Sequence, residues 1–255
     1  MKQYDVVEKV SQAIMADSLA RAIFIRGSLA RGTEDQYSNV DLGVIVDDAN
    51  IQIFLKKRYE YIKAYSEVMY LKDEYQSDIT TICIYENGVY LKLFVVSLSD
   101  FHHTDDIAII HDPDGIIEDL NVESLSFSPA EVGSLLDSFF LNAIEFYNSY
   151  KRGDLIYSFR LASQLAYELG IFLRIQYDPE YAKLGLKKFM NQVDFQSKEK
   201  YFEIIKKLKY DTSLECVKWM YVFLDSYLNS LPIAIVKHIN FDFYNYTKQL
   251  IMSIV

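Results

Sequence analysis

The pattern of apolar and polar residues predicts alternating helices and strands at the start of the chain. Apolar residues recur with a period close to 3.6 over residues 2–19, which predicts a helix. Short, almost wholly apolar runs at 22–25 and 40–46 predict strands that are buried on both faces. A second amphipathic helix is expected over 51–65, capped by the polar segment 47–50. The first elements are therefore helix, strand, strand and helix.

The helix expected over 51–65 has an apolar and a basic face. The residues expected to face the sheet are Ile53, Phe54, Tyr61 and Ile62. The residues expected to face water are Lys56, Lys57, Arg58 and Lys63. This basic face is interpreted as a solvated surface, with a substrate funnel as the alternative.

Residues 79–98 carry the strongest local signal for β structure. Two β-rich runs flank Asn87-Gly88, and both residues tolerate the positive φ that a tight hairpin turn requires. A further short strand is expected over 107–110, with a turn at 112–115. Together with the earlier elements, these strands predict a sheet domain of α+β class over residues 1–120.

The second half of the chain has a helical pattern throughout. Ser128, Pro129 and Glu131 form a predicted capping box with proline in the first turn, which opens a helix to about residue 150. The segment 151–154 breaks the pattern before a second long helix over 155–176. Further helices are expected from Asp178-Pro179, from Ser197, from a second capping box at 212–215, and over 232–253. We therefore expect a helical domain over residues 121–255.

Composition narrows the classes of partner. The 36 acidic and 26 basic residues give a net charge of -10, which argues against a long contact with nucleic-acid phosphates. No apolar run reaches the roughly 20 residues of a membrane span. The two cysteines, Cys83 and Cys216, are far apart, and no signal segment is evident, so the cytoplasm is the expected compartment. A nucleotide or another small molecule is the expected partner.

Candidate chemistry concentrates between residues 23 and 47. Gly27-Ser28 follows an apolar strand and is expected to form a sharp turn at the start of a short helix, where backbone N–H groups can bind a phosphate. Arg31, or Arg26, can add positive charge to that site. Asp41 lies within the next buried strand, and a buried carboxylate is costly unless a cation compensates it.

This segment resembles the nucleotidyltransferase superfamily of the polymerase-beta type. Gly27-Ser28-Leu29-Ala30-Arg31-Gly32, followed by Asn39-Val40-Asp41, is similar to the motif of its aminoglycoside and lincosamide nucleotidyltransferases. The resemblance implies a nucleotidyltransferase sheet domain followed by a helical acceptor-binding domain. It also implies transfer of a nucleoside monophosphate from Mg²⁺-bound nucleoside triphosphate, such as ATP, to a hydroxyl of a small molecule such as an antibiotic. Such enzymes hold two Mg²⁺ ions on three carboxylates.

The chain departs from that family at two positions. Asn39 replaces the first acid of the acid-x-acid pair, and Lys92 stands where the third acid is expected. We predict a degraded metal site in which Asp41 remains and Asn39 is a weak ligand. Glu86 or Asp78 could approach instead if the hairpin register differs. Lys92 could pair with Asp41 in place of a metal ion, or extend to solvent.

Several functions remain open from the sequence. Glu145 or Glu168 could be the general base for an acceptor hydroxyl, with a solvated helix glutamate as the alternative reading of each. The leading interpretation is a nucleotidyltransferase-like protein with impaired activity. The alternatives are an inactive nucleotide- or ligand-binding module and an antitoxin-type protein nucleotidyltransferase. The expected partners are a nucleotide, a small-molecule acceptor and a possible second copy in a homodimer.

Overall fold

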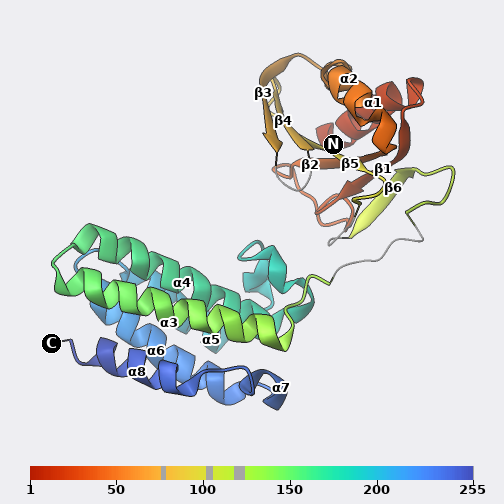
Figure 1. The fold of residues 1–255 in the computed structure, drawn as a ribbon. Coiled ribbons are helices and arrows are strands. Elements are labelled where there is room, and N and C mark those ends of the chain that lie inside the picture. The colour runs from red at the N-terminus through yellow and green to blue at the C-terminus, as the bar shows by residue number, and fades with distance from the viewer. Residues whose placement is uncertain (76–78, 102–105, 118–123, 255) are drawn as a thin grey trace. The chain divides into compact units, whose positions relative to one another are not determined.

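Six strands form one mixed sheet in the first of two units, Met1–Glu123 and Ser124–Val255 (Figure 1). The computed structural model describes residues 1–75, 79–101, 106–117 and 124–254. The strands are β1 (Ala20–Arg26), β2 (Val40–Val46), β3 (Val68–Tyr75), β4 (Ile79–Tyr85), β5 (Tyr90–Ser97) and β6 (Ile107–His111). Their order is β3-β4-β5-β2-β1-β6, and only β2 and β5 run parallel among the described strand pairs.

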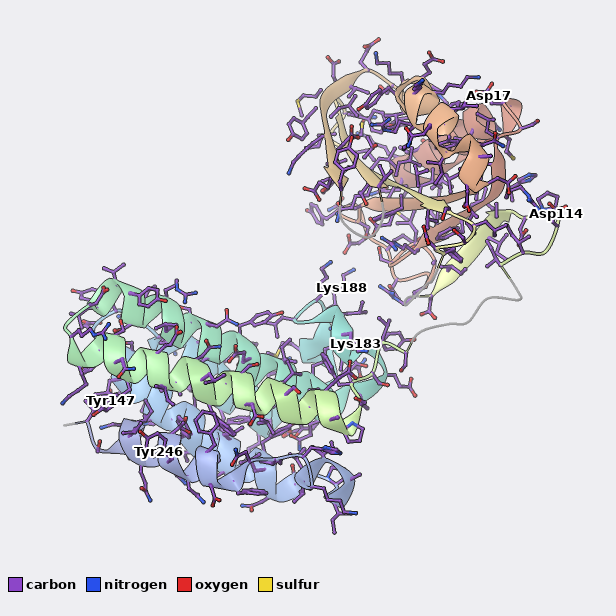
Figure 2. The ribbon with its side chains drawn as sticks, in the orientation of Figure 1. Asp17, Asp114, Tyr147, Lys183, Lys188 and Tyr246 are labelled. Carbon is purple, nitrogen blue, oxygen red and sulfur yellow. The ribbon has the colours of Figure 1, made fainter. Side chains whose placement is uncertain are left out.

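Two helices cover one face of this sheet, α1 (Lys2–Ala16) and α2 (Ile51–Lys63). Buried residues of both helices form one apolar cluster with alternate residues of the central strands, among them Leu42 and Leu93. Asp17, directly after α1, joins the two helices, because its carboxylate accepts hydrogen bonds from Tyr61 (2.6 Å) and Lys57 (3.1 Å) (Figure 2). Helices α1 and α2 therefore do not cover the opposite face of the sheet.

Most elements of this unit match the sequence pattern, and the α+β class is confirmed. The helix at the start, the strand over 40–46, the hairpin with its turn at Asn87-Gly88 and the strand near 107 are all present. Strand β3 was not predicted: residues 68–71 are apolar but residues 72–74 are charged, so no alternation of apolar and polar residues marks a strand, and none of its residues is fully buried.

The expected faces of α2 were only partly right. Phe54, Tyr61 and Ile62 are buried, but the Ile53 side chain is 48% exposed. Arg58, expected in water, is buried against Asp73 of β3. The polar segment before α2 forms a 3₁₀ turn, Asp48–Asn50, and Asn50 makes no side-chain cap hydrogen bond. The helix start therefore does not depend on the expected cap.

The second unit is helical and has its own apolar core. Its helices are α3 (Pro129–Lys151), α4 (Leu155–Tyr177), α5 (Phe195–Lys207), α6 (Ser213–Ser230), α7 (Ile233–Val236) and α8 (Phe241–Met252). Two 3₁₀ turns, Pro179–Leu184 and Phe189–Asn191, lie between α4 and α5. Helices α3 and α4 lie side by side and antiparallel (Figure 1). Among the described residues, no helix combines the length and the apolar character needed to cross a membrane.

Local signals predicted this unit unevenly. The capping box of Ser128 and Glu131 is confirmed on both of its hydrogen bonds. The second capping box is wrong, because the Thr212 hydroxyl donates to the Lys207 carbonyl instead of capping α6. The helix expected after Asp178-Pro179 is a 3₁₀ turn. The single helix expected over 232–253 is two helices, α7 and α8, with residues 237–240 between them.

Candidate functional site

Three charged residues lie side by side across the middle of the sheet. Asp41 of β2 pairs directly with Arg26 of β1 on one side and with Lys92 of β5 on the other. Residues that pair directly on neighbouring strands project to the same face of a sheet. We call these three residues the charged row. The register therefore brings the single carboxylate of the motif between two cations.

The charged row occupies the sheet face opposite α1 and α2. Leu42 and Leu93, which follow Asp41 and Lys92 in their strands, belong to the apolar cluster under those helices. Successive residues of a strand point to opposite faces, so the charged row points away from the helices. Arg26, Asp41 and Lys92 are each partly buried, which leaves them within reach of a ligand.

Aromatic side chains accompany the two cations of the charged row. The Arg26 guanidinium carbon lies 3.5 Å from the ring centroid of Phe94, and the Lys92 ammonium lies 5.7 Å from that of Tyr90. Both distances are within the range of cation–π attraction. Burial, followed by the negative charges of Glu74 and Asp41, raises the pKa of Tyr90. Tyr90 therefore lies in the electrostatic field of Asp41.

An apolar cluster closes the same face beyond the charged row. Gly43 leaves space for the ring of Phe24, since a Cβ on Gly43 would lie 2.1 Å from the Phe24 Cζ atom. Phe24 packs edge-on against Phe101 at a centroid distance of 5.2 Å. Other members of this cluster are Ala22, Ile45, Val96 and Ile117. A ligand on this face would therefore be limited to the charged row and to the sheet edge at Asn39.

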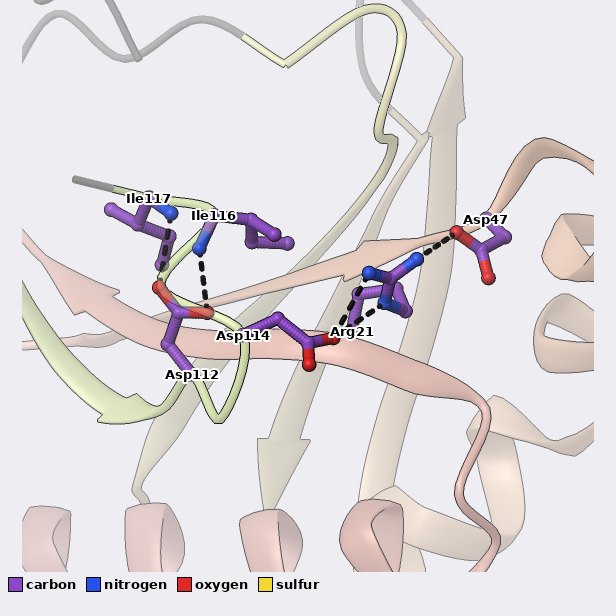
Figure 3. A network of polar contacts seen from close by, with 6 residues as sticks. All are labelled: Arg21, Asp47, Asp112, Asp114, Ile116 and Ile117. Atoms are coloured by element: carbon purple, nitrogen blue, oxygen red, sulfur yellow. Dashed lines mark hydrogen bonds and ion pairs between the residues drawn. The ribbon is translucent and has the colours of Figure 1, made fainter. Parts of the chain in front are cut away.

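The loop after β6 is held over this apolar cluster by hydrogen bonds (Figure 3). The Asp112 carboxylate accepts from the backbone N–H groups of Ile116 (3.0 Å) and Ile117 (2.9 Å). Arg21 of β1 bridges Asp114 of the same loop and Asp47 after β2, at 2.9 Å to each. The Asp112 contacts order the loop internally, the Arg21–Asp114 contact fixes it to the sheet, and Ile117 of this loop is buried.

The segment after β1 is a turn and not the expected short helix. Gly27 has a φ of +76°, which favours glycine, and its carbonyl accepts from the Arg31 N–H at 3.1 Å. The Ser28 carbonyl accepts from Thr33 N–H at 3.0 Å. Arg31 is partly buried within this turn. Since Gly27 directly follows Arg26, the turn begins at the charged row.

A pocket of about 560 Å³ lies at the edge of the sheet beside Asn39. Its lining includes Asn39, Tyr90, Tyr37, Asn87 and Gln3. The Gln3 amide of α1 donates to the carbonyls of residues 35, 36 and 38, with the shortest distance, 3.1 Å, to Ser38. Helix α1 therefore fixes the loop that leads from the Gly27-Ser28 turn into β2.

The residues around Asp41 do not fit a two-metal centre. Mg²⁺ prefers several oxygen ligands, with carboxylates supplying most of the protein's charge. Of the described residues in the charged row and at its border, Asp41 offers a carboxylate and Asn39 an amide, and two cations flank the carboxylate. Among the residues that the structure describes, no group of three or more His, Cys, Asp or Glu side chains could hold a metal ion. Glu86 lies in the exposed hairpin turn, and Asp78 lies outside the described residues.

Glu145 belongs to the helical unit. It is exposed on α3 and lines a pocket of about 270 Å³ together with Arg152 and Asp154. Its assignment as a general base stays a prediction, as do the roles of Gly27, Ser28, Arg31 and Asn39. Tyr90 was not predicted as a site residue, although its position two residues before Lys92 places it on the same strand face.

Comparisons with known proteins returned solved structures only. The chain is similar to an aminoglycoside 6-adenyltransferase from Bacillus subtilis, with 11% identity and a TM-score of 0.40 over 99% of both chains. It is also similar to a nucleotidyltransferase-like protein from Exiguobacterium sibiricum 255-15, with 12% identity and a TM-score of 0.41 over 91% of this chain and 78% of that one. No family model and no curated protein matches significantly. Both structures are named as an adenyltransferase or a nucleotidyltransferase-like protein. Likenesses at this identity and TM-score assign no role to any residue of this chain.

Proposed function

We propose that the sheet unit binds a nucleoside triphosphate without Mg²⁺ and does not transfer its nucleotidyl group. The phosphates would lie against the Gly27-Ser28 turn, and Lys92 with Arg26 would supply the positive charge. The observation that carries this proposal is the strand register, which places Asp41 of β2 opposite Arg26 of β1 and opposite Lys92 of β5.

Charge supports binding of an anion over binding of metal ions. Two cations and one carboxylate give the charged row a net charge of about +1, whereas three carboxylates would give about -3. A positive row repels Mg²⁺ and attracts phosphate oxygens, and both effects are stronger at partly buried sites than in bulk water. The same residues therefore favour a nucleotide and disfavour its metal.

The same arrangement is unsuited to nucleotidyl transfer. In the enzymes that the motif resembles, metal ions supply the electrostatic stabilisation of the reacting phosphate and of the leaving pyrophosphate. Arg26 and Lys92 can bind ground-state phosphates, but they compensate Asp41 at the same time. We infer a binding module in which nucleotide occupancy, and not turnover, is the function.

A second candidate is a metal-dependent transferase acting on a hydroxyl of a small molecule such as an antibiotic. Asn39 favours it, because this residue precedes Asp41 by two positions and lines the pocket at the sheet edge. Asn39 and Asp41 would then hold one Mg²⁺ through an amide and a carboxylate oxygen. Glu145 would be the candidate base.

Calorimetry with ATP, GTP and CTP separates the two candidates. We expect binding in EDTA, with little gain when Mg²⁺ is added. Ser28→Ala should weaken binding about tenfold, because it removes a hydrogen bond to a charged ligand. Ser66→Ala, a serine between α2 and β3, is the matched control and should bind like the wild type. Binding that requires Mg²⁺ would favour the transferase.

A further inference from the structure

A separate pocket of about 300 Å³ lies within the helical unit. Its wall is formed by α3, α4 and the 3₁₀ turn Pro179–Leu184. Apolar and aromatic side chains that line it are Phe127, Leu135, Tyr167, Ile171 and Phe172. The size lies at the lower end of the range for small-molecule sites, which are mostly apolar with a few fixed polar groups. Among its polar lining residues, Glu168 is the acid.

Glu168 is held in place through only one of its carboxyl oxygens. Oε1 accepts from the Asn142 amide at 2.6 Å and from the Gln164 amide at 2.9 Å. Oε2 is buried and has no hydrogen-bond partner within the described parts of the chain. The whole residue is 9% exposed. A buried carboxyl oxygen without a partner is costly, so a donor from outside the protein would stabilise it.

The nearby cation of the pocket is engaged elsewhere. Lys183, labelled in Figure 2, also lines the pocket, and its ammonium lies 3.1 Å from Glu131 and 5.8 Å from the ring centroid of Phe127. Burial raises the pKa of Glu168, although the two amides oppose this effect. Glu168 is therefore a desolvated acid whose hydrogen bonds within the described residues come from two neutral amides and not from a cation.

We propose that this pocket binds a small organic ammonium ion with one apolar group. The ammonium would donate to Glu168 Oε2, and the apolar group would contact Leu135, Ile171 and Phe172. An ammonium donor forms a stronger hydrogen bond with the carboxylate than a hydroxyl donor does, because both partners are then charged. The volume suits a single ring and not a multi-ring aminosugar. This proposal concerns the helical unit alone and does not rest on nucleotide binding.

Calorimetry of the full-length chain with benzylamine tests the proposal, with benzyl alcohol as the neutral probe of similar shape. We expect saturable binding of one benzylamine and weaker binding of the alcohol. Glu168→Gln should weaken benzylamine binding by roughly tenfold or more, since it removes the charge but keeps the acceptor for Asn142 and Gln164. Glu215→Gln, at an exposed position of α6, is the control and should bind like the wild type.

A second variant covers the case in which Glu168→Gln fails to fold. Ser138 is exposed on α3 and lines the pocket, so Ser138→Phe should fill it from the surface and also weaken benzylamine binding. The proposal is overturned if benzylamine does not bind the wild type. It is equally overturned if the alcohol binds as tightly as the amine, or if a folded Glu168→Gln or Ser138→Phe variant binds benzylamine as the wild type does.

Discussion

Gly43 shows how one small residue shapes the open face of the sheet. The Phe24 ring lies directly over Gly43, so the apolar cluster beyond the charged row depends on the absence of a side chain there. Gly43 stands inside an apolar run, and its role could not be predicted from the run alone. The close approach comes from the pairing of Phe24 with Gly43 on the neighbouring strand.

Gly43→Ala should lower the free energy of unfolding by about 1–3 kcal/mol, because the new methyl group forces Phe24 out of its place. Urea denaturation measures the change. Phe24→Leu provides the matched background. Because the ring is then absent, Gly43→Ala should lower the free energy of unfolding clearly less than it does in the wild type. Equal costs in both backgrounds would show that Phe24 is not the residue that excludes a side chain at Gly43.

Arg58 is buried, although the helical pattern of α2 predicted that it faces water. It follows two lysines on α2 and was expected in water, yet its guanidinium lies 2.6 Å from the Asp73 carboxylate, with both side chains largely buried. Thr81 completes the cluster, donating to Asp73 at 2.7 Å and accepting from Arg58 at 3.0 Å. The partner residues of Arg58 lie on β3 and β4, and Asp73 stands within three consecutive charged residues of β3, 72–74, a run that is not typical of a strand. The pairing was therefore invisible in the sequence.

Asp73→Asn should lower the free energy of unfolding by roughly 3 kcal/mol, since it leaves the buried Arg58 without its counter-charge. Burial would raise the pKa of Asp73, but hydrogen bonds from Tyr59, Thr81 and Arg58 outweigh it and lower that pKa. The stabilisation should thus be complete above the usual aspartate range and decline as the pH falls below it. Chemical denaturation across pH measures both effects. Glu60→Gln, at an exposed position of α2, is the control, and an equal loss in both variants would contradict the account.

At the scale of elements, local signals succeeded where the residues involved are close in sequence. The hairpin turn at Asn87-Gly88 and the capping box at Ser128 are examples. The break between α7 and α8 was missed, because it depends on a contact distant in sequence. The carbonyl of His238 approaches Gly133 of α3 so closely that a Cβ would lie 2.5 Å from it. Asn240 then caps α8 by accepting from the Phe243 N–H, a local signal that could have been used.

The capping box of α3 predicts a pH-dependent helix start. The Ser128 backbone N–H donates to Glu131, and this bond, with the serine hydroxyl and Lys183, lowers the pKa of Glu131 to about 2. Because the folded pKa is lowered, this stabilisation is present above the usual glutamate pKa and is lost as the pH falls toward about 2.

Ser128→Ala should lower the free energy of unfolding by about 1 kcal/mol at neutral pH, as expected for loss of an N-cap. The difference from the wild type should shrink as Glu131 becomes protonated. Thermal denaturation at several pH values measures this. Ser134→Ala, at an exposed position of the same helix, is the control. A loss for Ser128→Ala no larger than that of the control would contradict the role of the cap.

For the whole molecule, the part of the candidate site that is contiguous in sequence was predictable. The Gly27-Ser28 turn and Asp41 lie in one segment, and the resemblance implied that Lys92 stands on a neighbouring strand, where the parallel register of β2 and β5 places it opposite Asp41. The position of Arg26 on the other side of Asp41 required the order β5-β2-β1, which no local pattern specifies. The pocket at Asn39 likewise depends on α1 and the hairpin turn, which are distant in sequence.

The central claim is that Lys92 replaces metal charge in nucleotide binding. ATP affinity measured by calorimetry in EDTA tests it, with Lys92→Met and Lys72→Met compared to the wild type. Lys72 of β3 is exposed, paired with Glu74 at 2.8 Å and two strands from β5, so it controls for lost charge on the same sheet. The account predicts roughly tenfold weaker binding for Lys92→Met and an unchanged affinity for Lys72→Met. Undiminished binding in Lys92→Met, or wild-type binding that appears only with Mg²⁺, would contradict it.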